Sequence, residues 1–278
     1  MLGIHANRNS NRKGENTIKK FVKQMVQKTF NLIGYDVTFS RKASQSIVVV
    51  DKNIWEPYFL TNQKMQIYFE ALKQSQNEWS DNFYKQLRYY SLQELVHYVL
   101  RQKLNGDFVE CGVWRGHSAY MISRILSENE FNGRFHIFDS FEGGLSTKVE
   151  KDKNLRSELS EENIQKESNV FYSTETQVKS CLKGFEFIHL YKGWIPSRFN
   201  EVEDKKFSFV HIDVDLYEPT LASLNFFYPK LVKGGVIVCI NYGLTQFPGV
   251  KKGVEEFLEN NTCQIFYEVP MGGCFVIK

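Results

Sequence analysis

The sequence lacks the features that would direct it to a membrane or to nucleic acid. It has no apolar run long enough to span a bilayer, and its first residues lack the apolar stretch of a secretion signal. The formal net charge is only +3 over 278 residues, so the total charge gives no sign of nucleic-acid binding. The absence of internal repeats excludes a solenoid. We therefore expect a cytoplasmic protein with no nucleic-acid partner.

Cysteine is also scarce, and its distribution is uninformative for metal binding. The five cysteines are scattered, odd in number and never in the spacing of a metal-binding finger. This usage is typical of reduced thiols in the cytosol. The length allows one large α/β domain, or a core domain with an appendage.

Charge is unevenly distributed along the chain. Nine basic and two acidic side chains precede Ala43, a charge of +7 that leaves −4 for the rest. At residues 18–35, apolar side chains recur at helical spacing with lysines between them, which predicts an amphipathic helix. Such a helix lies on an anionic membrane surface or, as we favour, packs on the domain or on a second subunit of a homodimer. We predict a basic extension at residues 1–50, disordered over 1–17, and a main domain at 51–278.

Short β-rich runs alternate with helical patterns from residue 107 onward. This alternation predicts an α/β fold with a doubly wound, mostly parallel, Rossmann-like sheet. The strand candidates at 263–269 and 273–278 are joined by the turn signal PMGG, so we predict a C-terminal antiparallel hairpin. A parallel sheet with such a hairpin is the pattern of class I methyltransferases. Residues 143–170 are too long for an ordinary connection and form either a solvated insertion or a lid.

The stretch ECGVWRG, residues 110–116, occupies the first predicted turn from a strand to a helix. Ligands of open parallel sheets sit outside the carboxyl ends of strands, where glycine allows close approach of the backbone. Gly112 and Gly116 would lie under a nucleoside or an amino-acid tail, and Glu110 would hold an ammonium group. The G-x-x-x-G spacing lacks the dinucleotide pattern, so an NAD-dependent oxidoreductase is the less favoured alternative.

Three further carboxylates follow strand ends. Asp139 ends the second predicted strand, where an acid is suited to the hydroxyls of a ribose. Asp213 and Asp215 follow the fourth strand, and on an extended chain both would point to the same side. They would repel each other unless a cation, a proton or a bend separates them. His211, inside the same apolar strand, is more typical of a hydrogen-bonded core histidine than of a catalytic base.

Six motifs keep an order and spacing that resemble the macrocin O-methyltransferase family of class I S-adenosylmethionine-dependent enzymes. The motifs are ECGVWRG, DSFEG, KGW, IDVDLYEPT, YPKLVKGGVIV and NYG, and the resemblance extends from about Tyr89 to Glu259. It implies that residues 51–278 are a methyltransferase domain that uses S-adenosyl-L-methionine to methylate a hydroxyl of a sugar, on a small molecule or a glycan. It implies cofactor contacts from Glu110, Cys111, Gly112, Gly116, Asp139, Ser140 and Phe141. It also matches Asp215 to a magnesium ligand.

The sequence departs from the family's pattern in two places. The family has a D-D-Y triplet after the fifth strand that supplies metal carboxylates, whereas this chain has Ile240, Asn241 and Tyr242. Asn241 can still offer an oxygen to Mg²⁺ but Ile240 cannot, so we expect a weak metal site at Asp215 and Asn241. The family's lid histidine has no counterpart in residues 143–170.

These departures leave two readings of the function. We predict Asp213 and Asp215 as the catalytic residues of an O-methyltransferase. The alternative is a binding protein on a degraded methyltransferase fold, non-catalytic or with altered specificity.

Overall fold

The structure is a computed structural model that describes residues 24–26, 28–29, 35–39, 47–51, 63–153, 170–269 and 272–278. By its internal contacts the chain divides into two units, Met1–Asn62 and Gln63–Lys278. In the first unit, residues 24–26 and 28–29 are helical, and β1 (Tyr35–Phe39) pairs antiparallel with β2 (Ile47–Asp51). The predicted disorder of residues 1–17 and most of the predicted helix at 18–35 lie outside the described residues. The predicted division at residue 50 stays a prediction.

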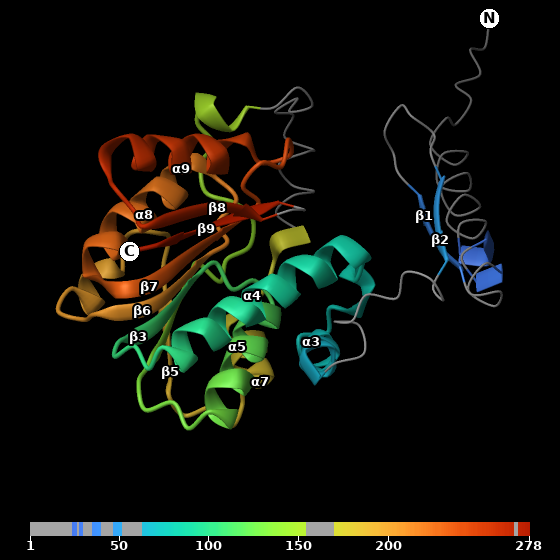
Figure 1. Cartoon of the computed structure of the whole chain (residues 1–278), viewed down its shortest axis with the longest axis horizontal. Helices are drawn as coiled ribbons and strands as arrows, with labels where there is room; N and C mark the ends of the chain where they lie inside the picture. Colours follow the sequence, from blue (N-terminus) through green and yellow to red (C-terminus); the bar gives the residue numbers. More distant parts are fainter. Residues whose placement is uncertain are drawn as a thin grey trace, which may run out of the picture. The chain divides into compact units, whose positions relative to one another are not determined.

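The second unit contains a seven-stranded sheet in the order β5-β4-β3-β6-β7-β9-β8 (Figure 1). The parallel strands are β3 (Asp107–Cys111), β4 (Phe135–Asp139), β5 (Ile188–Lys192), β6 (Phe207–Ile212) and β7 (Leu231–Ile240). β9 (Gly273–Ile277) runs antiparallel to β7, and β8 (Ile265–Val269) runs antiparallel to β9. The structure therefore confirms both the doubly wound sheet and its C-terminal hairpin.

Helices cover both faces of this sheet (Figure 1). One layer contains α3 (Gln63–Gln74), α4 (Phe83–Arg101), α5 (His117–Glu128) and α7 (Glu175–Cys181), and the other contains α8 (Tyr217–Lys230) and α9 (Pro248–Asn260). Short 3₁₀ turns lie at Glu78–Ser80, Glu150–Asp152 and Phe199–Val202. Side chains alternate across β3, so that Phe108 packs in the core beside α5 and Val109 in the core beside α8. Burial on both faces explains why apolar residues occupy both faces of these strands.

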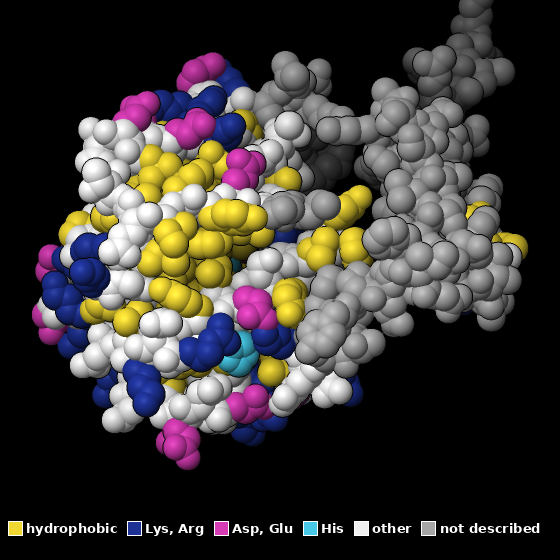
Figure 2. Space-filling model, viewed as in Figure 1, with side chains coloured by type: hydrophobic (Ala, Val, Ile, Leu, Met, Phe, Trp, Pro, Cys, Tyr) yellow, Lys and Arg dark blue, Asp and Glu magenta, His cyan; other side chains and the backbone are white. Residues whose placement is uncertain are grey.

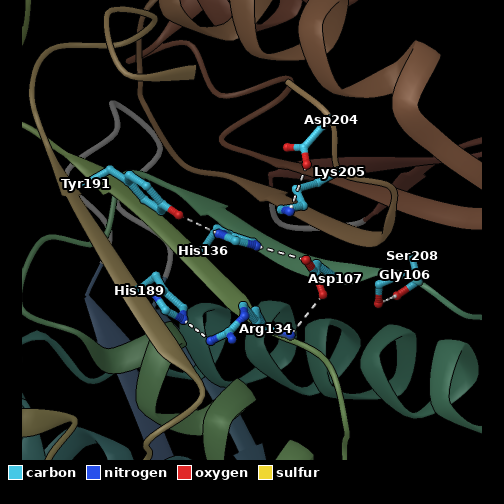
Figure 3. Close-up of polar contacts among 9 residues, drawn as sticks. All are labelled: Gly106, Asp107, Arg134, His136, His189, Tyr191, Asp204, Lys205 and Ser208. Carbon is cyan, nitrogen blue, oxygen red and sulfur yellow. Dashed lines mark hydrogen bonds and ion pairs between the residues drawn. The ribbon is translucent and has the colours of Figure 1, made fainter. Parts of the chain in front are cut away.

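A polar chain ties three adjacent strands together (Figure 3). His136 of β4 lies between the carboxylate of Asp107 on β3, at 3.0 Å, and the hydroxyl of Tyr191 on β5, at 2.9 Å. Burial alone would raise the pKa of Asp107, but hydrogen bonds from His136 and from the Arg134 amide outweigh it and lower that pKa. Asp107 begins β3, so this tie involves the end of that strand opposite to the carboxyl end where ligands are expected.

The edge strand β8 exposes apolar side chains. Ile265, Phe266 and Tyr267 lie on the edge strand β8 and are 48%, 38% and 54% exposed. Hydrophobic side chains gather over β8 and β9 in Figure 2. An exposed edge strand can pair with a further segment of chain. Among the described helices, none has the length and apolar character needed to cross a membrane.

Candidate active site

The carboxyl ends of the central strands border a cavity of about 350 Å³. Its walls include the strand ends, the first turns of α4 and a loop after β4. Residues from these parts include Gly112, Asp139, Asp213 and Asn241; Lys85, Arg88 and Tyr89; and Gly143, Gly144, Leu145 and Ser146. This is the position at which an open α/β sheet binds its ligands.

Most of the predicted site residues line this cavity. The lining residues are Gly112, Asp139, Ser140, Asp213, Asp215 and Asn241. The other four lie behind its wall. Glu110 and Cys111 are fully buried, Phe141 belongs to the hydrophobic core, and Gly116 caps the start of α5. The side chain of Cys111 packs in the core beside α8. Because none of these four residues lines the cavity, the cofactor contacts that the resemblance implied for them stay predictions.

Gly112 is required by the packing of the protein itself. Its φ is +83°, and a Cβ placed there would lie 2.1 Å from the carbonyl oxygen of Asp213. Gly116 also has a positive φ, of +90°, and a Cβ there would lie 3.1 Å from the sulfur of Cys181. At Gly112 the structure thus shows a close approach to the chain's own backbone. Gly112 also lines the cavity, and its contact with a ligand stays a prediction.

We expect Gly112→Ala to destabilise the protein more than Gly184→Ala. Gly184 has a φ of +99° and no heavy atom within 4 Å of the position that a Cβ would take, so its replacement carries only the left-handed backbone cost of about 1–2 kcal/mol. Gly112→Ala adds overpacking of about 1–3 kcal/mol. Urea unfolding of both variants measures the difference. Equal losses of stability would contradict the clash with Asp213.

Asp139 holds the first turn against the end of the second strand. One oxygen accepts hydrogen bonds from the amides of Val113 (2.8 Å) and Trp114 (3.2 Å), and the other accepts from the amide of Phe141 (2.8 Å). Trp114 and Phe141 have positive φ values of +46° and +52°, which these bonds stabilise. A carboxylate has about four lone-pair sites, so Asp139 can still accept a hydrogen bond from a hydroxyl group of a ligand in the cavity.

Glu110 forms a buried pair with His211. The two residues are register partners on β3 and β6, and Oε1 of Glu110 lies 2.8 Å from Nδ1 of His211. Their side chains are 0% and 1% exposed. Burial raises the pKa of Glu110, while the hydrogen bond with His211 acts in the opposite direction. The interpretation of His211 as a hydrogen-bonded core histidine is confirmed, and Glu110 supports the strand end from within the core.

His117 is held in a similarly closed environment at the start of α5. Its ring stacks on Tyr89 at a centroid distance of 4.3 Å, and its Nε2 lies 3.3 Å from the carbonyl oxygen of Tyr68. Burial, with the nearby charge of Lys85, keeps the pKa of His117 well below its usual range. A neutral, stacked imidazole of low basicity is poorly suited to accept a proton from a hydroxyl.

A bend and an amide separate the two aspartates. Asp215 has a φ of +63°, so the chain after β6 is not extended at this point. The side-chain amide nitrogen of Asn241 donates to Asp215 at 2.5 Å and to Asp213 at 3.4 Å, and its oxygen accepts from Nη1 of Arg88 at 2.9 Å. Asp215 is buried at 6% exposure, whereas Asp213 is half-buried and lines the cavity.

A magnesium ion does not fit the predicted ligands Asp215 and Asn241 in this arrangement. Mg²⁺ needs oxygen ligands at about 2.0–2.1 Å in octahedral geometry. Asn241 turns its nitrogen toward the carboxylates and gives its oxygen to a guanidinium. Ile240 offers no ligand atom, and within the described ranges no group of three or more His, Cys, Asp or Glu side chains is arranged to hold a metal.

The sequence did not reveal the basic side chains that α4 brings to the cavity. Arg88 lines it one turn after Lys85, whose Nζ donates to the hydroxyl of Ser80 at 2.6 Å. Burial lowers the pKa of Lys85 to about 8, and the charge of Arg88 adds to this, although Asp81 and Asp213 act in the opposite direction. A lysine and an arginine one turn apart usually lie on a solvated helix face, so no local sequence signal distinguished these two cavity residues from ordinary surface residues.

Aromatic side chains and the loop after β4 complete the walls. Trp114, Phe171 and Trp194 line the cavity. The indole nitrogen of Trp114 donates to the carbonyl of Val170, and that of Trp194 donates to Glu142, both at 3.1 Å. The predicted insertion at 143–170 thus borders the cavity through its described residues, while 154–169 lie outside them. Its role as a lid stays a prediction.

Comparison with known proteins identifies relatives that match more than half of the chain. Residues 40–269 match the family model described as Macrocin-O-methyltransferase (TylF). The chain is 24% identical over 198 residues to demethyldecarbamoylnovobiocin O-methyltransferase of Streptomyces niveus, covering 68% of this chain and 73% of that protein. It is 26% identical over 162 residues to 8-demethyl-8-(2,3-dimethoxy-alpha-L-rhamnosyl)-tetracenomycin-C 4'-O-methyltransferase of Streptomyces olivaceus, covering 55% and 59%. The solved structure of the O-methyltransferase NovP shares the fold, with a TM-score of 0.56, 20% identity and coverage of 75% and 88%.

Proposed function

This chain belongs to the macrocin O-methyltransferase family and is an S-adenosyl-L-methionine-dependent O-methyltransferase, and we propose that it methylates a hydroxyl group of a sugar on a small natural product or a glycan. The observation that carries the proposal is the half-buried carboxylate of Asp213 in a cavity that also contains the predicted cofactor side, Asp139 and Ser140. One relative is named for the 4' hydroxyl of a rhamnosyl group. That name supports a sugar as the class of acceptor.

The cofactor side of the cavity is formed by the ends of β3 and β4. When bound, S-adenosyl-L-methionine supplies a methyl group already activated by its sulfonium. Asp139 and Ser140 line the cavity and, in our proposal, accept hydrogen bonds from the ribose hydroxyls, with the backbone of the turn at Gly112 as the adjoining wall. The rings of Trp114 and Trp194 offer apolar faces on which the flat adenine can lie.

The acceptor side is formed by the loop after β6 and the end of β7. A sugar hydroxyl is a poor nucleophile, so a base must remove its proton as the new bond to carbon forms. Asp213 accepts that proton, because the hydrogen bond that its carboxylate receives from Asn241 is long, at 3.4 Å. Asp215, held at 2.5 Å by Asn241, orients the hydroxyl or the loop that carries Asp213. Holding the oxygen in line with the methyl group supplies much of the rate.

Calorimetry with S-adenosyl-L-methionine, S-adenosyl-L-homocysteine and NAD tests the cofactor, and methyl transfer to a rhamnosylated acceptor and its aglycone tests the acceptor. We expect both sulfur nucleosides to bind with a Kd of roughly 1 μM–1 mM, the usual range of enzyme affinities, and NAD not to bind. Transfer should occur only to the glycosylated acceptor. Methylation of the aglycone alone would contradict a sugar hydroxyl as the target, and cofactor binding without transfer to any acceptor would favour the non-catalytic alternative.

Peripheral binding to a membrane, or formation of a homodimer, through the basic segment at 18–35 remains a separate proposal from the sequence. Sedimentation with anionic vesicles and a mass measurement, each on the full chain, distinguish the two.

A further inference from the structure

The side chain of Asn241 links Arg88 to both predicted catalytic carboxylates. Arg88 projects from α4 into the cavity and donates to the oxygen of Asn241 at the end of β7, 153 positions away in the sequence. Asn241 in turn donates to Asp215 and Asp213. The four side chains form a continuous path from a permanent cation to the two anions.

The chemistry of its partners fixes the direction of the Asn241 amide. Arg88 has only donors and the carboxylates have only acceptors, so the amide oxygen must face Arg88 and the nitrogen must face the aspartates. The reverse orientation would place oxygen against oxygen and N–H against N–H. Asn241 has a φ of +68° and Asp215 has a φ of +63°, a conformation that Asn and Asp tolerate better than other side chains. The backbone at both strand ends therefore presents these side chains to each other.

The arrangement also places a positive charge near the two carboxylates, which would otherwise repel each other. Two carboxylates that share a cavity disfavour one another's ionisation unless an opposite charge is near. The side chain of Arg88 is a guanidinium cation. Its guanidinium supplies a positive charge behind Asn241, and that charge cannot be removed by a chelator.

We propose that Arg88, acting through Asn241, is a positioning residue that takes the place of a divalent metal ion at this site. It keeps the Asn241 nitrogen directed at the two aspartates, and Asp213 lines the cavity beside it. The inference rests on the proposed function, in which Asp213 accepts the proton of the acceptor. It gives a structural reason for the asparagine at position 241, where the resemblance led us to expect a metal-binding carboxylate.

Titration with Mg²⁺ alone, followed by calorimetry, tests the exclusion of the metal without any acceptor. The wild-type chain should show no binding of Mg²⁺ at millimolar concentration, and Arg88→Met, which frees the oxygen of Asn241, should acquire it. Arg101→Met, which removes the same charge from the exposed end of α4, is the matched control and should behave as the wild type. Binding of Mg²⁺ to the wild-type chain, or its absence in Arg88→Met, would overturn the proposal. This titration succeeds or fails independently of whether a sugar is the acceptor.

Kinetics tests the positioning role. Arg88→Met and Asn241→Leu should each lower kcat at least tenfold with the cofactor affinity unchanged, and Arg88→Lys should recover part of the loss. Because both residues act along one path, the double variant should lose no more than the worse single variant. Additive losses, or a wild-type kcat in Arg88→Met, would overturn the proposal. If Arg88→Met does not fold, Arg88→Lys and Asn241→Leu provide the same comparison.

Discussion

Asp213→Asn is expected to lower kcat by a factor of about 10²–10⁴, the contribution typical of a well-positioned general base. The substitution preserves the shape of the side chain but removes the basic oxygen that takes the proton of the acceptor hydroxyl. Affinity for S-adenosyl-L-methionine should change little, since Gly112, Asp139 and Ser140 lie at the ends of other strands. Steady-state methyl transfer and calorimetry on the same preparation measure the two quantities.

Asp204→Asn is the matched control for this prediction. Asp204 is a surface aspartate, 75% exposed and paired with its neighbour Lys205, so its loss should leave kcat unchanged. A wild-type kcat in Asp213→Asn would show that another group takes the proton. Lys85, which lines the same cavity and has a pKa of about 8, is then the next residue to replace.

The sheet was predictable from the sequence because its strands are buried on both faces. A strand covered on each side by helices carries apolar residues on both of its faces, and the runs at β3, β4, β6 and β7 show that pattern apart from a few polar positions such as Glu110 and His211. The hairpin was predictable from its turn residues. The strand at Ile47–Asp51 was missed although it reads IVVVD, because it lies in a segment judged by its charge and by the helical spacing that precedes it.

The candidate site was predictable only where it follows the ends of strands. Asp139, Asp213 and Asp215 were found because the carboxyl edge of a parallel sheet collects the residues that follow each strand. Arg88 was missed because its partner is 153 positions away and its own helix carries no motif. The enclosure of Glu110 could not be predicted, since it depends on pairing with His211, 101 positions away on a neighbouring strand.

The Glu110–His211 pair supports the largest expected loss of stability. His211→Ala should lower the free energy of unfolding by about 3–5 kcal/mol near pH 8, because it leaves a fully buried carboxylate without its partner. Replacing both residues, as in Glu110→Leu with His211→Leu, removes the buried charge and should be less harmful than His211→Ala alone. Urea unfolding of the two single variants and the double variant gives the coupling between the residues.

The pH dependence of His211→Ala identifies the cause of that loss. Burial raises the pKa of Glu110 above its unfolded value, and removing the opposing hydrogen bond from His211 raises it further. The folded variant then binds a proton more readily than the unfolded chain, so its stability increases as the pH falls through the raised pKa. We therefore expect the deficit relative to the wild-type chain to be largest at pH 8 and to shrink toward pH 5. A deficit that is constant over this range would show that lost packing around the imidazole, and not the unpaired charge of Glu110, destabilises the variant.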